Sequence, residues 1–135
     1  MAVFLLSIAF LGMASLQAAS LRGHSHALAQ SAASMASHSL FEAMRADADS
    51  ARRGAYNTDG YLYADACPEA GTSPVGKQLH DWCESLGIAL GAPSHTSGSV
   101  QCDAEGDCVV TVNFDHDANA ASESEHPGVA IEGTL

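Results

Sequence analysis

An uncharged apolar segment opens the sequence and limits what the chain can fold into. Residues 1–16 contain ten large apolar side chains, and the first charged residue is Arg22. The first proline is Pro68, so helix can continue through residues 1–67 without the break that proline causes. The sequence predicts one long helix over residues 1–53, with an apolar part at about 1–20 and an amphipathic part at about 21–53. Gly54 and the turn sequence that follows it predict the helix end.

The apolar part has three interpretations. A cleaved secretory signal requires basic residues before its apolar core, and this segment has none. A complete transmembrane helix requires about 20 apolar residues, whereas residues 3–16 would span only about 21 Å as helix. The third interpretation, that the segment begins upstream of Met1, is favoured because it removes this shortfall. The residues expected to anchor the helix in lipid or in a fibre core are Val3, Phe4, Leu5, Leu6, Ile8, Phe10, Leu11 and Leu16.

The amphipathic part has large apolar residues on one predicted face. Leu21, Leu28 and Met35 are seven residues apart, and Phe41 and Met44 continue the pattern at helical spacing. We expect these five side chains to pack the helix on the rest of the chain or on adjacent subunits. The alanines and serines between them permit close approach of helices. Two shorter helices separated at Gly23 are the alternative.

The part of the chain after residue 53 contains all four cysteines. About eighty residues can bury only a small core, and an even number of cysteines behind an export-type N-terminus favours two disulfides. Cys102 and Cys108 flank a predicted hairpin turn, so a bond between them would join the strand ends. Cys67 and Cys83 would then tie a loop to a helix. The three possible connectivities remain open at this stage.

Periodicity in this second part predicts one helix and several strands. Residues 76–90 have the apolar spacing of a helix, whereas 99–102 and 108–114 are strands around an acidic turn, and 129–132 is a last strand. A helix followed by antiparallel strands defines an α+β fold, a long N-terminal helix packed on a small antiparallel sheet. The expected core residues are Leu79, Trp82, Leu86, Val110, Val112 and Phe114.

Charge and motifs exclude several functions. The formal charge is −11, with five basic and sixteen acidic residues, so a nucleic-acid partner is not expected. The sequence lacks a C-x-x-C pair, His24, His26 and His38 have no convergent ligands, and the acidic turn at 103–107 lacks the EF-hand spacing. A nucleophile motif such as G-x-S-x-G is also absent. We therefore expect no cofactor, no metal, no small-molecule substrate and no enzymatic activity.

The order of several short motifs resembles that of minor pilins of type IV pili, of the PilV kind. The N-terminal motifs are Phe4-Leu-Leu-Ser-Ile-Ala-Phe-Leu-Gly-Met-Ala-Ser-Leu-Gln17, Leu21-Arg22, Phe41-Glu-Ala-Met-Arg-Ala-Asp47 and Gly54-Ala-Tyr-Asn57. The later motifs are Leu79-His-Asp-Trp82, Gly98-Ser-Val100 and Val110-Thr-Val-Asn-Phe-Asp115. The resemblance covers nearly the whole chain up to the acidic segment at residues 117–127. It implies a pilin-like fold, with residues 54–135 as a disulfide-braced head.

The resemblance implies a non-enzymatic subunit for the assembly or priming of type IV pili. Its partners would be other major and minor pilins, the pilus assembly machinery and the inner membrane, with the head in the periplasm and then at the pilus surface. Such pilins begin with a basic leader that ends just before the apolar helix, and Met1 follows where that leader would end. The alternatives are a pseudopilin of type II secretion and a secreted disulfide-stabilised binding domain behind a signal peptide.

Overall fold

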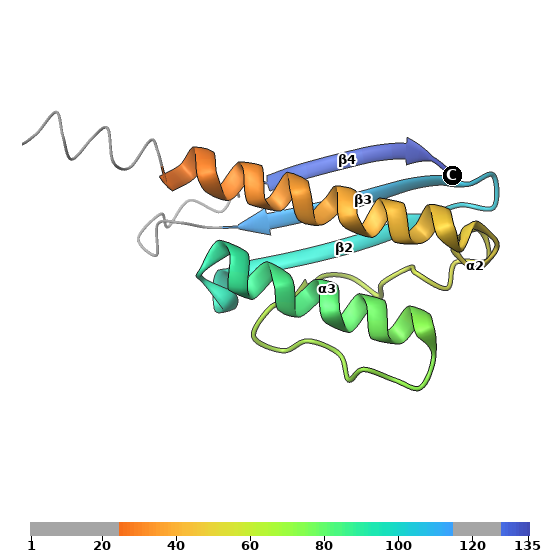
Figure 1. The fold of residues 1–135 in the computed structure, drawn as a ribbon, viewed down its shortest axis with the longest axis horizontal. Helices are drawn as coiled ribbons and strands as arrows, with labels where there is room; N and C mark the ends of the chain where they lie inside the picture. Colours follow the sequence, from red (N-terminus) through yellow and green to blue (C-terminus); the bar gives the residue numbers. More distant parts are fainter. Residues whose placement is uncertain (1–24, 115–127) are drawn as a thin grey trace, which may run out of the picture.

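The computed structural model describes residues 25–114 and 128–135, which form a sheet with helices on one face (Figure 1). The sheet has four antiparallel strands in the order β1-β2-β3-β4. Helix and antiparallel sheet together confirm the α+β class. Leu21 of the predicted packing face lies outside the described residues. So do all the predicted anchoring residues, which are Val3, Phe4, Leu5, Leu6, Ile8, Phe10, Leu11 and Leu16.

The strands follow one another along the chain as a meander. Strand β1 is Leu62–Tyr63, β2 is Thr96–Cys102, β3 is Asp107–Phe114 and β4 is Gly128–Thr134. The register places Val100 opposite Val110, and Val110 opposite Ile131. Strand β3 alternates buried and partly exposed residues, the period-two pattern that predicted it.

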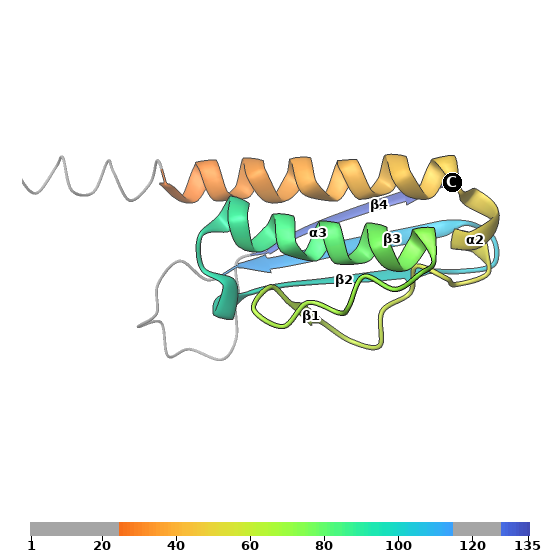
Figure 2. The ribbon, with the colours of Figure 1, turned by 60° about the horizontal axis from the view of Figure 1, so that its bottom comes forward.

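The first helix of the described chain covers residues 25–46 and lies along the sheet (Figure 2). Its buried residues are Ala29, Ala33, Ser37, Leu40, Phe41 and Met44. Alanine at the contact brings the helix axis close to the sheet, and the phenyl ring of Phe41 lies over Gly133 of β4. Small residues therefore form much of the surface that packs on the head.

The helix ends before the predicted residue 53. Asp47 has non-helical backbone angles (φ −128°, ψ 52°), and the short helix α2 runs from Ala48 to Arg52 beyond it. The carbonyl of Asp47 accepts hydrogen bonds from the N–H groups of Ser50 and Ala51, which begin α2. Aspartate is unfavourable in helix interiors and favoured at helix N-termini, which accounts for the break at Asp47. The spacing of apolar residues does not predict this break.

Helix α3, Pro74–Leu90, lies beside the first helix on the same face of the sheet. Ser73 caps it by accepting a hydrogen bond from Gly76 N, Pro74 occupies the first turn, and Gly91 ends it in the left-handed conformation at φ 68°. These caps extend the helix two residues before its predicted start at 76. The 3-10 helix η1, Pro93–His95, then leads into β2.

The core lies between the sheet and the two helices. Trp82, Leu86, Val110, Val112 and Phe114 are buried in it. Leu79, the remaining residue of the predicted core, is partly buried and packs against its edge. The indole of Trp82 lies directly over β2, where a Cβ on Gly98 would come within 2.3 Å of it. Glycine at this position therefore lets α3 approach the sheet.

Two disulfides select one of the three possible connectivities. Cys67 pairs with Cys83 and ties the loop after β1 to α3. Cys102 pairs with Cys108, and these residues are opposite each other in the β2–β3 register with Cα atoms 4.1 Å apart. That separation is typical of a non-hydrogen-bonded antiparallel pair, so the second bond joins positions that the hairpin already holds together.

Candidate functional site

The two long edges of the sheet are the surfaces on which another strand could add, and they differ. Hydrogen bonds within an antiparallel ladder alternate, so every second residue of an edge strand directs its N–H and C=O away from its neighbour. Asp103 N donates to Asp107 O at 3.0 Å, which fixes this alternation for β2. Thr96, Gly98, Val100 and Cys102 therefore direct their backbone groups away from β3.

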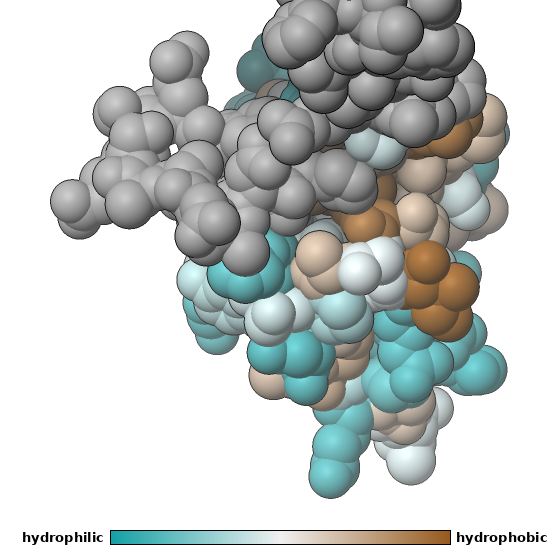
Figure 3. Space-filling model, turned by 90° about the vertical axis from the view of Figure 1, so that its left-hand side faces the viewer, coloured by the Kyte–Doolittle hydropathy of each residue, from teal (hydrophilic) through white to brown (hydrophobic). Residues whose placement is uncertain are grey.

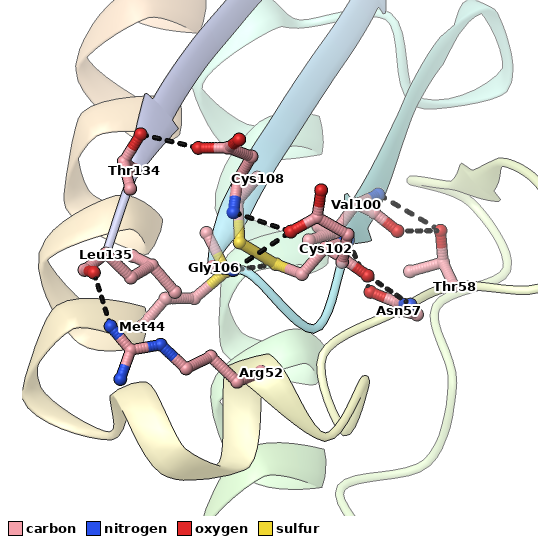
Figure 4. The surroundings of a disulfide bond; sticks show 12 residues. Met44, Arg52, Asn57, Thr58, Val100, Cys102, Gly106, Cys108, Thr134 and Leu135 are labelled. Carbon is pink, nitrogen blue, oxygen red and sulfur yellow. Dashed lines mark hydrogen bonds between the residues drawn. A yellow bond between two sulfur atoms is a disulfide. The ribbon is translucent and has the colours of Figure 1, made fainter.

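Residues 57–64 occupy that edge of β2. The Asn57 amide donates to Cys102 O and accepts from Cys102 N, at 3.0 and 2.6 Å (Figure 4). Val100 N donates to the Thr58 hydroxyl at 3.1 Å, and Thr58 N donates to Val100 O at 3.0 Å. An asparagine side chain and a threonine thus take the place that a neighbouring strand would occupy.

The remaining positions of this edge are paired by backbone. Leu62 of β1 is opposite Gly98, and Ala64 N donates to Thr96 O at 3.0 Å. We call this fully bonded side of β2 the closed edge. Cys67, three residues beyond Ala64, holds the end of the segment to α3 through its disulfide.

Strand β4 forms the opposite side of the sheet. Leu135 N donates to Gly106 O at 2.9 Å, one position beyond the pair formed by Asp107 and Thr134. By the same alternation, the backbone N–H and C=O groups directed away from β3 belong to Gly128, Ala130, Glu132 and Thr134. Within residues 25–114 and 128–135, no hydrogen bond reaches these groups. We call this side of β4 the open edge.

The turn between β2 and β3, residues 103–106, is held by hydrogen bonds. The Asp103 carboxylate accepts from Gly106 N and Asp107 N at 2.9 and 2.8 Å. Gly106 has φ +96°, a conformation that favours glycine. Arg52 donates to Leu135 O at 2.7 Å and so joins α2 to the residue after β4 (Figure 4). The Asp103 carboxylate therefore binds the backbone of its own turn, and the Asp107 carboxylate accepts from the Thr134 hydroxyl of β4.

A third surface lies on the first helix, opposite its buried side. Leu28 and Met35 are 58% and 68% exposed, and Ser31 and His38 lie exposed beside them. We call these four residues the outer helix stripe. Between residues 25 and 41 the sequence has no Asp, Glu, Lys or Arg. The predicted packing face therefore divides: Phe41 and Met44 are buried against the head, whereas Leu28 and Met35 stay largely exposed.

Apolar surface elsewhere is dispersed. Figure 3 views the end of the molecule at which the described helix begins and shows separate brown patches among hydrophilic side chains. Among the large apolar residues of the described ranges, Ile88 on α3 has the largest exposed fraction, at 84%. A cavity of about 310 Å³ on the uncovered face of the sheet is lined by Tyr61, Tyr63 and Asn113 among others.

One ionisable group in the interior has a shifted pKa. Burial raises the pKa of Tyr56 above its usual value of 10.0, and the nearby Asp47 carboxylate raises it further. Its hydroxyl donates to Gln78 Oε1 on α3, so the neutral form is the bonded one. Tyr56 therefore joins the segment before the closed edge to α3 through this hydrogen bond.

The described residues contain no group of three or more His, Cys, Asp or Glu side chains that could hold a metal ion. His26 lies near Phe114, with ring centroids 6.0 Å apart, and His80 bonds the carbonyl of Pro68. In the same part of the chain, no helix is long and apolar enough to cross a membrane.

Two features of the site escaped prediction. The segment containing Asn57 and Thr58 was predicted to end the helix and to continue as a loop, but its side-chain hydrogen bonds to β2 were not predicted. Asn and Thr side chains readily bond to backbone groups in this way. The open edge was not predicted, because the sequence analysis gave only a last strand at 129–132 and no order of strands. No family model, no curated protein and no solved structure matches the chain.

Proposed function

We propose that the chain is a non-enzymatic minor pilin that takes part in the assembly or priming of type IV pili. It is held in the inner membrane by its N-terminal helix and enters the fibre through that helix. The head, residues 54–135, stays outside the membrane and contacts neighbouring subunits. The proposal begins from the order of motifs along the chain, which resembles that of PilV-like minor pilins.

The outer helix stripe is the observation that carries the proposal. A helix on the surface of a soluble monomer usually has charged residues on its solvent side. This helix instead exposes Leu28, Met35 and short polar side chains, with no ionised Asp, Glu, Lys or Arg over residues 25–41. Such a surface suits close packing on a second helix, because it has little to desolvate and few long side chains to order.

The charged residues of the helix support the same division. Glu42 and Arg45 form an exposed ion pair at 3.0 Å, one turn before the helix ends. Thirteen of the sixteen acidic residues lie in the head, residues 54–135, and none precedes Glu42. This distribution suits a subunit that is buried by its helix and solvated by its head.

The test places a charge on the outer helix stripe. Leu28→Glu is expressed in cells that assemble type IV pili, and the variant is measured in sheared filaments and in the membrane fraction. A carboxylate at a helix–helix contact must be desolvated without a partner, so we expect its share in filaments to fall by about tenfold or more. Its amount in the membrane fraction should stay unchanged, because the substitution lies outside the apolar segment.

Ile88→Glu is the matched control. Ile88 is also an exposed aliphatic residue on a helix, but it lies on α3 of the head. We expect this variant to enter filaments like the unmodified chain. Equal incorporation of both variants, or absence of the unmodified chain from filaments and membrane alike, would contradict the proposed function.

A further inference from the structure

We propose that the open edge of β4 accepts an extended segment of another protein chain, which adds to the sheet as a fifth strand. This contact uses the backbone of β4 on the head, whereas the groove beside it is lined in part by Ser31, Met35 and His38 of the outer helix stripe. The backbone groups of Gly128, Ala130, Glu132 and Thr134 supply the hydrogen bonds of the added strand. Strand addition draws its affinity from such main-chain bonds and its specificity from alternate side chains.

The contrast with the closed edge motivates the assignment. Unpaired edges invite pairing with other chains, and folded proteins usually cover, shorten or charge them. In this protein the side of β2 is covered residue by residue, by Asn57, Thr58, Leu62 and Ala64. Strand β4 is seven residues long, has one charged residue and is left uncovered within the described chain.

The core layer is also incomplete on the side of β4. Val110 and Val112 of β3 are fully buried, whereas their neighbours Ile131 and Val129 on β4 stay partly exposed. These β4 side chains face the same helix-covered side of the sheet, where they pack against the edge of the core. An added strand would bring its own inward side chains next to them and exclude water from both.

A groove beside this edge provides space for those side chains. It has a volume of about 580 Å³ and lies between the first helix and β4, lined by Ala27, Gln30, Ser34, Met35 and Val129 among others. The groove has small residues on the helix side and a methionine at its rim, which adapts to different apolar partners. Valine-sized side chains on alternate residues of the added strand match this lining.

Charge selects the kind of strand. Glu132 is the only charged residue of β4, it is exposed, and neither β4 nor the lining of the groove contains Lys or Arg. Opposite charges across a strand pair stabilise it and like charges destabilise it. A second copy of this chain, with a net charge of −11, is therefore disfavoured relative to a neutral or basic strand with Lys or Arg opposite Glu132.

The experiment uses the full chain in detergent micelles and a synthetic peptide as the added strand. The peptide is acetyl-Thr-Val-Lys-Val-Thr-Val-Thr-amide, whose valines face the groove and whose lysine meets Glu132 when it pairs antiparallel. Hydrogen–deuterium exchange should show the amides of Ala130, Glu132 and Thr134 protected by about tenfold or more at about 1 mM peptide. The same peptide with glutamate in place of lysine should bind about tenfold more weakly.

Two variants of the chain make the result specific. Ala130→Pro removes an outward N–H without touching the β3–β4 ladder, and peptide affinity should fall by about tenfold while the fold is retained. Glu132→Lys should reverse the preference between the two peptides. Unchanged exchange of β4 with peptide present would overturn the proposal. Protection of β4 that grows with the concentration of the chain alone, and is lost in Ala130→Pro, would assign the edge to a second copy and overturn it equally.

Discussion

The two edges of this sheet show two ways of treating the same unpaired backbone. On β2, the amide of Asn57 and the hydroxyl of Thr58 satisfy backbone groups that no full strand reaches. On β4, the equivalent groups of Ala130 and Glu132 have no partner within the described residues. The closed edge draws on a segment some forty residues earlier in the sequence, whereas the open edge depends only on local strand pairing.

This difference predicts where the protein tolerates change. Contacts at the closed edge couple residues 57–67 to β2 and α3, so their loss should lower the free energy of unfolding. Changes to the outward groups of β4 should leave that free energy nearly constant and alter only association. The predictions below separate the two edges by this criterion.

Loss of the disulfide that fixes the covering segment should have the largest effect. Cys67 and Cys83 close a loop with a sequence separation of 16, and the bond restricts the unfolded chain by about 3 kcal/mol. We expect Cys67→Ala/Cys83→Ala to lower the free energy of unfolding in urea by about that amount. The amides of Thr58 and Val100 should also exchange faster, because the end of their segment is released.

The second disulfide provides the control for that result. Cys102 and Cys108 are only six residues apart and already opposite in the hairpin, so Cys102→Ala/Cys108→Ala should cost less, about 2 kcal/mol. The amides of Thr58 and Val100 should keep their protection relative to global unfolding. Faster exchange at Thr58 in this control, equal to that in the first variant, would show that the covering segment does not depend on Cys67.

Removal of one hydroxyl tests the closed edge directly. The Thr58 hydroxyl accepts from Val100 N and donates to Gly60 O at 2.7 Å, in a nearly buried position. Thr58→Val keeps the shape but leaves Val100 N without a partner, which should cost about 2 kcal/mol. Chemical denaturation at pH 7 measures the difference.

Thr111→Val is the matched change on β3. Thr111 is partly exposed on the face of the sheet that has no helix, and its substitution should change stability by less than about 0.5 kcal/mol. A loss for Thr58→Val no larger than that for Thr111→Val would mean that water replaces the hydroxyl at the edge. The Thr58 hydroxyl would then cover the edge of β2 without contributing to the free energy of unfolding.

Local pattern predicted the elements of this fold, and contacts distant in sequence decided their packing. Alternation over residues 108–114 and the apolar spacing of 76–90 were sufficient for β3 and α3, because those signals lie within the element. The predicted hairpin turn also places Cys102 and Cys108 close together, since they flank it on either side. The α+β class therefore follows from the sequence alone.

The faces of the first helix could not be derived in the same way. The large residues Leu28 and Met35 mark an apolar stripe, but periodicity does not state which stripe meets the sheet. The buried side is instead built from Ala29 and Ala33, followed by Phe41 and others, because the helix lies close to the sheet. The hydrogen bond between Asn57 and Cys102 likewise joins residues 45 positions apart, so no pattern of neighbouring residues predicts it.

Alkaline pH should weaken the attachment of the segment before the closed edge. Burial and then Asp47 raise the pKa of Tyr56 in the folded state above its usual 10.0. The unfolded chain therefore releases the proton first as pH rises, so the contribution is fully present below about pH 10 and is lost above it. We expect the free energy of unfolding to fall by about 1.4 kcal/mol for each unit by which this pKa is raised, once pH exceeds the folded value.

Tyr56→Phe isolates this contribution. At pH 7 the variant loses the hydrogen bond to Gln78 and should be about 1 kcal/mol less stable. Above pH 10 the difference between the two proteins should shrink, because phenylalanine has no proton to release. Parallel stability curves between pH 7 and pH 11, together with an unchanged tyrosinate absorbance titration, would refute the role of Tyr56.

Proline substitution on β4 should have the smallest effect on folding and is the sharpest measure of the open edge. Ala130 directs its N–H away from β3, so proline at this position removes no ladder hydrogen bond, and edge strands accept proline where the N–H faces solvent. We expect Ala130→Pro to change the free energy of unfolding by less than about 0.5 kcal/mol. Ile131 is its neighbour and bonds Val110 across the ladder, so Ile131→Pro should cost about 3 kcal/mol. Urea unfolding of the two variants shows which residues of β4 direct their backbone groups away from β3. Equal losses of stability would mean that the even-numbered residues do not do so, and that the sheet has no open edge of the kind described.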